Sequence, residues 1–148
     1  VGGINPVLMA FTQARASTAP AAQLVVALAR SLHAVEHHAV LDAVEHLGKT
    51  EDADVRWLPV DRLGRLDLDR FASEIAEGGD DIALVTVMWA NNEVGTLQPV
   101  AEVAALCAEH GIPFHTDAVQ AVGHVPVDAS VPTTLALSGH KVGGPHGV

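Results

Sequence analysis

The sequence is poor in cysteine and lysine, and it has no long apolar run near its start. Cys107 is the only cysteine among 148 residues, which excludes an internal disulfide framework and a multi-cysteine zinc site. A lone cysteine is compatible with a reducing compartment, so we expect a cytoplasmic protein. Lys49 and Lys141 are the only lysines. The apolar run at residues 24–29 is far shorter than the roughly 18 residues that span a bilayer.

Basic residues are scarce as well. There are 8 Lys and Arg against 18 Asp and Glu, so the formal net charge is −10. This charge argues against nonspecific binding to nucleic acid or to an anionic membrane. The length suits one domain, and a hydrophobic content of 49% argues against intrinsic disorder.

The first 35 residues contain no acidic group and nine alanines. This composition has three interpretations: an acid-poor transit peptide, the edge of a fragment, or a stretch translated in the wrong frame. Residues 1–35 carry no readable motif, and the only element that we expect there is a helix at about residues 20–33. We therefore place the start of the interpretable domain at residue 36.

From residue 36 onward, helical and strand patterns alternate. Apolar residues at a spacing of three to four, with glycine after each run, predict helices at residues 36–48, 67–77 and 99–110. Short apolar runs predict strands at residues 54–60, 82–88, 112–115 and 133–137. The run at 82–88 is almost continuously apolar, as is typical of a strand covered on both faces. The pattern predicts a layered α/β domain with a mainly parallel sheet.

Three of these predicted strands lead directly into polar clusters. The clusters are Asn91-Asn92-Glu93-Val94-Gly95, Asp117-Ala118-Val119-Gln120 and Ser138-Gly139-His140-Lys141. In open α/β sheets, ligands bind beyond the carboxyl ends of the strands. The three clusters therefore predict a single site.

Each cluster also has a purely structural explanation. The Asn91-Asn92 pair can form a turn, Asp117 can cap a following helix, and residues 138–140 can form a turn before a surface loop. Lys141 taken alone would be a solvated surface lysine.

The nine histidines raise the option of a metal site. His37-His38, or His115 with Asp117, could supply ligands. No HExxH or similar spacing occurs, so we expect no metal.

Taken together, the same residues fit one cofactor, pyridoxal phosphate, which needs a lysine for a Schiff base and an acid beside its pyridine nitrogen. Lys141 lies beside the polar clusters, whereas Lys49 follows a polar helix end, so Lys141 is the candidate lysine. Asp117 is the candidate acid, and Gln120 can project from the same turn toward the phenolic oxygen. The glycine between Ser138 and His140 lets the backbone approach a phosphate.

Four stretches, in their order and spacing, resemble the cysteine desulfurases, a class V group of pyridoxal-phosphate enzymes with the aspartate-aminotransferase fold. They are Glu36-His37-His38-Ala39-Val40-Leu41-Asp42, Asn91 to Gly95, His115 to Gln120 and Ser138 to Lys141. The resemblance implies that residues 36–148 are part of a three-layer, fold type I large domain. It also implies homodimers that convert L-cysteine to L-alanine and pass the sulfur, as a persulfide, to an acceptor or scaffold protein for iron–sulfur clusters or thio-cofactors.

The resemblance also implies roles around the cofactor ring. His37 would stack on the ring and help to shuttle protons. Asn92 and Gln120 would bond the side of the phenolic oxygen, and Asp117 the ring nitrogen.

For the rest of the cofactor, the resemblance assigns the loop at residues 138–141. Ser138 and His140 would hold the phosphate, and Lys141 would form the Schiff base.

Three departures from the family pattern stand beside these matches. Residues 1–35 contain no Ser/Thr-rich phosphate-binding turn, and residues 128–134 are about two residues short. The third departure is that the given sequence ends seven residues after Lys141, whereas in the family the small domain, the substrate-binding arginine and the loop with the nucleophilic cysteine follow the Schiff-base lysine. We therefore expect a fragment that is inactive alone. The alternatives are another class V enzyme, such as a selenocysteine lyase or an aminotransferase, and a non-catalytic α/β module.

Cys107 is not expected to be the nucleophile. It lies on the same face of the predicted helix as Val103 and Ala104, so we expect a small buried hydrophobe. The neighbouring Glu102 and Glu109 would favour the neutral thiol.

Overall fold

The computed structural model describes residues 23–26, 38–50, 53–78 and 81–145. Along the chain, the described elements are β1 (Gln23–Val26), α2 (His38–Thr50), β2 (Asp54–Trp57), α3 (Leu68–Gly78), β3 (Ile82–Thr86), α4 (Val100–Glu109), β4 (Phe114–Asp117), β5 (Thr134–Ala136) and the 3₁₀ turn η2 (Gly139–Val142). Within these residues the strands form one sheet in the order β2-β1-β3-β4-β5, and every neighbouring pair is parallel.

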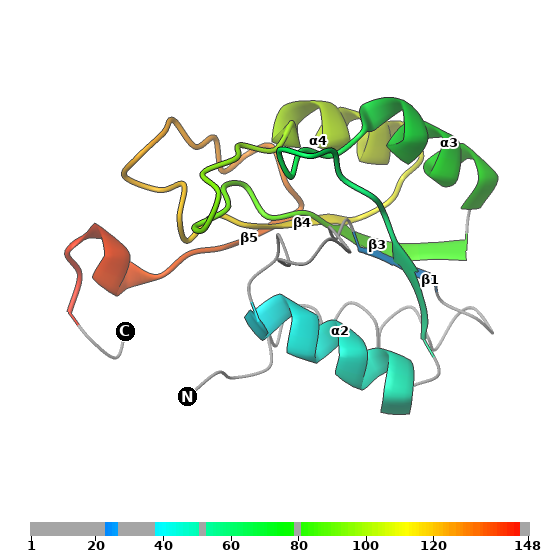
Figure 1. The fold of residues 1–148 in the computed structure, drawn as a ribbon, viewed down its shortest axis with the longest axis horizontal. Helices are drawn as coiled ribbons and strands as arrows, with labels where there is room; N and C mark the ends of the chain where they lie inside the picture. The colour runs from blue at the N-terminus through cyan, green and yellow to red at the C-terminus, as the bar shows by residue number, and fades with distance from the viewer. Residues whose placement is uncertain (1–22, 27–37, 51–52, 79–80, 146–148) are drawn as a thin grey trace.

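The sheet lies between two layers of helices, with α2 on one face and α3 and α4 on the other (Figure 1). All five residues of β3 are buried, as expected for a strand that is covered on both sides. The three-layer α/β fold predicted from the sequence is therefore confirmed.

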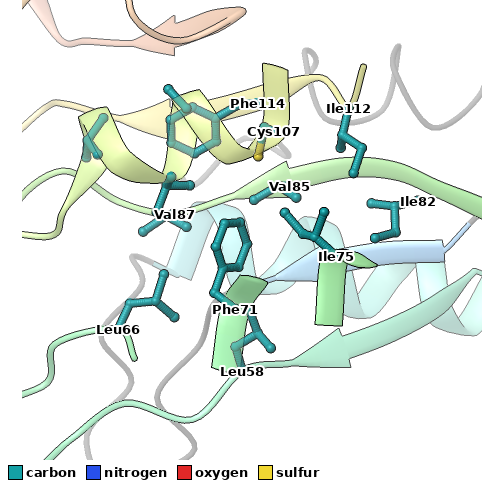
Figure 2. Packing of buried hydrophobic residues seen from close by; sticks show 13 residues of the cluster. Leu58, Leu66, Phe71, Ile75, Ile82, Val85, Val87, Cys107, Ile112 and Phe114 are labelled. Carbon is teal, nitrogen blue, oxygen red and sulfur yellow. The ribbon is translucent and has the colours of Figure 1, made fainter. Parts of the chain in front are cut away.

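The helix α3 shows how the sequence builds one of these layers. Asp67 precedes the helix, and its Oδ1 accepts hydrogen bonds at 3.1 Å from the N–H groups of Asp69 and Arg70, which are free at the start of a helix. Phe71 and Ile75, one turn apart, are fully buried and pack toward the sheet (Figure 2).

The helix α4 buries Cys107 in the same way. The thiol lies between α4 and the sheet, within the main apolar cluster (Figure 2), and the residue is 1% exposed. Burial raises the pKa of Cys107 to about 12. The prediction of a small buried hydrophobe is confirmed. The cause of its raised pKa is desolvation rather than Glu102 and Glu109, which are both exposed.

The helix expected at residues 20–33 is wrong over the part that the structure describes. Gln23–Val26 is the strand β1, which is bonded to β2 on one side and to β3 on the other. The surrounding alanines favour a helix locally, but Leu24-Val25-Val26 is apolar and largely β-branched and suits an interior strand. Hydrogen bonding on both edges outweighs local propensity. The first 35 residues thus contribute a strand to the same sheet.

The other expected elements are confirmed, with ends that differ by at most three residues. The strand expected at 54–60 ends at Trp57, and Val60 instead forms an antiparallel bridge with Leu66. No helix in the described part of the chain is long and apolar enough to cross a membrane.

Candidate active site

Backbone hydrogen bonds join the ends of β3, β4 and β5. The N–H of Trp89 donates to the carbonyl of Asp117 at 2.8 Å, and the N–H of Ala118 donates to the carbonyl of Ala136 at 2.9 Å. The segments that follow these three strands therefore start from one edge of the sheet. The structure thus brings together the segments that the sequence predicts to form a single site.

Asp117 is the last residue of β4 and is 8% exposed. Its Oδ1 accepts a hydrogen bond from the N–H of Val119 at 2.9 Å, and Oδ2 accepts none from the described residues. The carboxylate caps a series of turns rather than a helix. The capping explanation thus accounts for one of the two carboxylate oxygens. Gln120 follows within these turns and is half-buried.

His115 lies two residues before Asp117 in β4 and is fully buried. Its Nδ1 lies 2.9 Å from the Oγ1 of Thr134 in β5. Burial lowers the pKa of His115, and the nearby charge of Asp117 only partly opposes this. The imidazole is therefore neutral at pH 7.

Among the residues whose placement is described, no group of three or more His, Cys, Asp or Glu side chains lies close enough together to hold a metal ion. His37 lies outside the described residues, and so does its predicted role in stacking on a cofactor ring.

Asn91 builds the turn that follows β3. Its Oδ1 accepts hydrogen bonds from the N–H groups of Glu93 and Val94, both at 2.8 Å. The turn explanation is therefore confirmed for Asn91, which is buried. Asn92, the residue with the predicted cofactor contact, is exposed in the same turn.

Gln98, a residue that the sequence reasoning missed, ties two loops together. Its Oε1 accepts from the N–H of Leu66 at 3.0 Å, and its Nε2 donates to the carbonyl of Gly64 at 2.6 Å. Thr96 adds a hydrogen bond from its hydroxyl to the carbonyl of Leu63. No local signal could have revealed these contacts, because more than thirty residues separate the partners.

The loop after β5 folds tightly around Lys141. The Oγ of Ser138 lies 2.7 Å from the Nδ1 of His140, and the N–H of Lys141 donates to the carbonyl of Ser138 at 3.1 Å. Gly144 donates to the carbonyl of Gly139 at 2.8 Å. A Cβ on Gly144 would lie only 2.8 Å from that carbonyl oxygen, so glycine is required for this closure.

The two lysines have different surroundings. Lys141 is exposed on η2, within the loop that starts from the same edge of the sheet as Asp117. Lys49 lies in the last turn of α2 and forms an ion pair with Glu45 at 2.9 Å. This contrast supports Lys141 as the candidate lysine.

The described part of the chain is thus a parallel α/β/α domain with an acid at the end of β4 and a lysine in the loop after β5. The family profile described as Aminotransferase class-V matches residues 29–148, and the chain belongs to this family. Enzymes of this family use pyridoxal phosphate.

Curated relatives agree with this assignment. The chain is 50% identical over 116 residues to the IscS-like cysteine desulfurase of Mycobacterium tuberculosis, which covers 77% of the chain and 29% of that protein. It is 53% identical over 116 residues to the cysteine desulfurase NifS of Azotobacter vinelandii, and the match covers 77% of this chain and 28% of that protein. The chain thus spans less than a third of the length of these relatives.

Solved structures agree as well. SspA in complex with cysteine superposes with a TM-score of 0.77 at 31% identity, covering 95% of this chain and 38% of that one. DndA from Streptomyces lividans gives a TM-score of 0.76 at 31% identity, and the match covers 94% of this chain and 36% of that one. The resemblance to cysteine desulfurases and the fold type I assignment are therefore confirmed.

Proposed function

We propose that this chain is the cofactor-binding part of a pyridoxal-phosphate-dependent cysteine desulfurase. In the proposed reaction, the sulfur of L-cysteine moves to an enzyme thiol, which gives L-alanine and an enzyme persulfide. The observation that carries the proposal is that Asp117, whose Oδ2 accepts no hydrogen bond from the described residues, and the loop of Lys141 lie at the same edge of the sheet.

The residues at this edge fit the cofactor. When bound, pyridoxal phosphate supplies an electron-withdrawing ring that stabilises negative charge on the substrate carbon. Asp117 would accept a hydrogen bond from the ring nitrogen through Oδ2 and hold the proton there. Lys141 would bind the cofactor covalently through Nζ and then move protons at the substrate carbon.

Other side chains would orient the cofactor. Ser138 and His140, whose Oγ and Nδ1 atoms lie 2.7 Å apart, would bind the phosphate. Asn92 and Gln120 would face the phenolic oxygen, and His37 would stack on the ring. We further propose a cytoplasmic homodimer that passes sulfur to an acceptor or scaffold protein.

The test of cofactor binding uses the purified chain. Addition of pyridoxal phosphate is expected to produce a visible absorption band that saturates with concentration, because a lysine imine absorbs at longer wavelength than the free aldehyde. Absence of a saturable band would contradict the proposal.

The test of activity uses a chimera in which the matching 116 residues replace their counterpart in the Azotobacter vinelandii desulfurase. The chimera is expected to release alanine from L-cysteine. Failure of a folded, cofactor-loaded chimera to form alanine would limit the proposal to cofactor binding. The chain alone is expected to form none, because its only thiol, Cys107, is buried.

Cys107→Ala is expected to leave alanine formation by the chimera within a few-fold of the parent. A persulfide-forming thiol must reach both substrate and acceptor, whereas this thiol packs in the core with a pKa of about 12. In the native chain, Cys107 is also expected to react with a thiol reagent only after unfolding. A persulfide on Cys107, found by mass spectrometry, would contradict the expectation.

A further inference from the structure

A row of polar side chains, two of them fully buried, crosses the sheet next to Asp117. Thr86 of β3 is in register with His115 of β4, and His115 is in register with Thr134 of β5. Residues in register on parallel strands lie side by side on one face, and Asp117, two residues beyond His115, shares that face. The row therefore lies on the same face of the sheet as Asp117, next to the acid that is proposed to face the cofactor.

Burial of this row carries a cost. Thr86 and His115 are fully buried, and within the described residues the hydroxyl of Thr86 has no hydrogen-bond partner. A buried polar group is costly unless it is bonded, and Val85 and Val87, which flank Thr86 along the chain, belong to the apolar core. A polar row at this place therefore needs an explanation beyond packing.

The neutral state of His115 supplies an explanation for this polar row. A cationic imidazole beside Asp117 would form an ion pair and compete with a ligand for the carboxylate. Desolvation keeps the pKa of His115 low, and the contact with Thr134 Oγ1 at 2.9 Å fixes the ring. The side chain next to Asp117 on this face of β4 is thus buried, polar and uncharged.

We propose that His115 is a positioning residue for Asp117: held by Thr134, its imidazole limits the movement of the carboxylate, whose Oδ2 would accept a hydrogen bond from the pyridine nitrogen of pyridoxal phosphate. This inference rests on the proposed function and assigns a role to two residues outside the cofactor contacts named above. His115 is fully buried and is assigned no contact with the cofactor.

Thr134→Val tests the proposal, because it removes the hydroxyl that fixes the imidazole and keeps the shape of the side chain. In the purified chain, we expect pyridoxal phosphate to bind about tenfold more weakly, the effect of losing about one hydrogen bond. We also expect the pH at which the visible band of the bound cofactor titrates to move by about half a unit.

Thr133→Val is the matched control. The Oγ1 of Thr133 accepts a hydrogen bond from the N–H of Phe114 at 3.0 Å, so this variant also loses a side-chain bond between β4 and the residue just before β5. It leaves His115 untouched. We expect a similar loss of thermal stability in both valine variants, but unchanged affinity and an unchanged band in Thr133→Val.

His115→Phe provides a second variant, which keeps a ring and removes both nitrogens. It is expected to weaken cofactor binding at least as much as Thr134→Val. The double variant is expected to be no weaker than His115→Phe alone, since both changes act through one imidazole.

The outcomes separate the inference from the proposed function. If the parent chain binds the cofactor and Thr134→Val matches Thr133→Val in affinity and in the titration of the band, His115 has only a structural role and the inference is wrong. If the parent chain shows no band, the proposed function fails and the inference fails with it.

Discussion

Lys141→Ala is expected to abolish covalent attachment of pyridoxal phosphate to the chain. Borohydride reduction of the loaded parent chain should fix the cofactor on the peptide that contains Lys141, as read by mass spectrometry, and the alanine variant should carry no label. The physical reason is position: Lys141 is exposed on a tight turn beside the end of the sheet where Asp117 lies. In the chimera, the same change is expected to reduce alanine formation to background.

Lys49→Ala is the control for this result. Lys49 forms an exposed ion pair with Glu45 within α2, and such pairs contribute little to stability. The variant should therefore fold normally and keep the full label on Lys141. Label on Lys49 in the parent chain, or label that survives Lys141→Ala, would show that the site is assigned to the wrong lysine.

The sequence predicts the fold well where local patterns and tertiary structure agree. The apolar run at 82–88 is visible as a buried strand because both faces of β3 are covered. The helix expected at 20–33 shows the opposite case. Its local composition favours a helix, but β1 is stabilised by hydrogen bonds to β2 and β3, whose sequences lie far along the chain. A local pattern contains no information on such pairing.

The candidate site divides in the same way. The three polar segments after β3, β4 and β5 could be predicted to converge, because parallel strands end at a common edge. The row next to Asp117 could not be predicted, because it depends on register: His115 and Thr134 are nineteen residues apart and meet only in the folded sheet. The assignments of Asn92, Gln120, Ser138 and His140 to the cofactor stay predictions.

Asp117→Asn is expected to separate catalysis from folding. The amide oxygen can still accept the hydrogen bond from the N–H of Val119 that Oδ1 accepts at 2.9 Å, so the turn should form. The negative charge is lost, and with it the support for a protonated ring nitrogen. Removal of one preorganised group of this kind lowers turnover by about 10²–10³-fold. In the chimera, alanine formation should fall by that amount while the cofactor still binds.

Asp128→Asn is the matched control for this charge change. The Oδ1 of Asp128 also caps a turn, accepting from the N–H of Ser130 at 2.9 Å, but Asp128 is exposed and is not at the end of a strand. Both variants lose one negative charge and keep a turn-capping oxygen. Turnover by Asp128→Asn should stay near that of the parent, since long-range effects of an exposed charge are screened by salt. Equal turnover in the two variants would show that Asp117 has no role in the reaction and serves only to cap the turn.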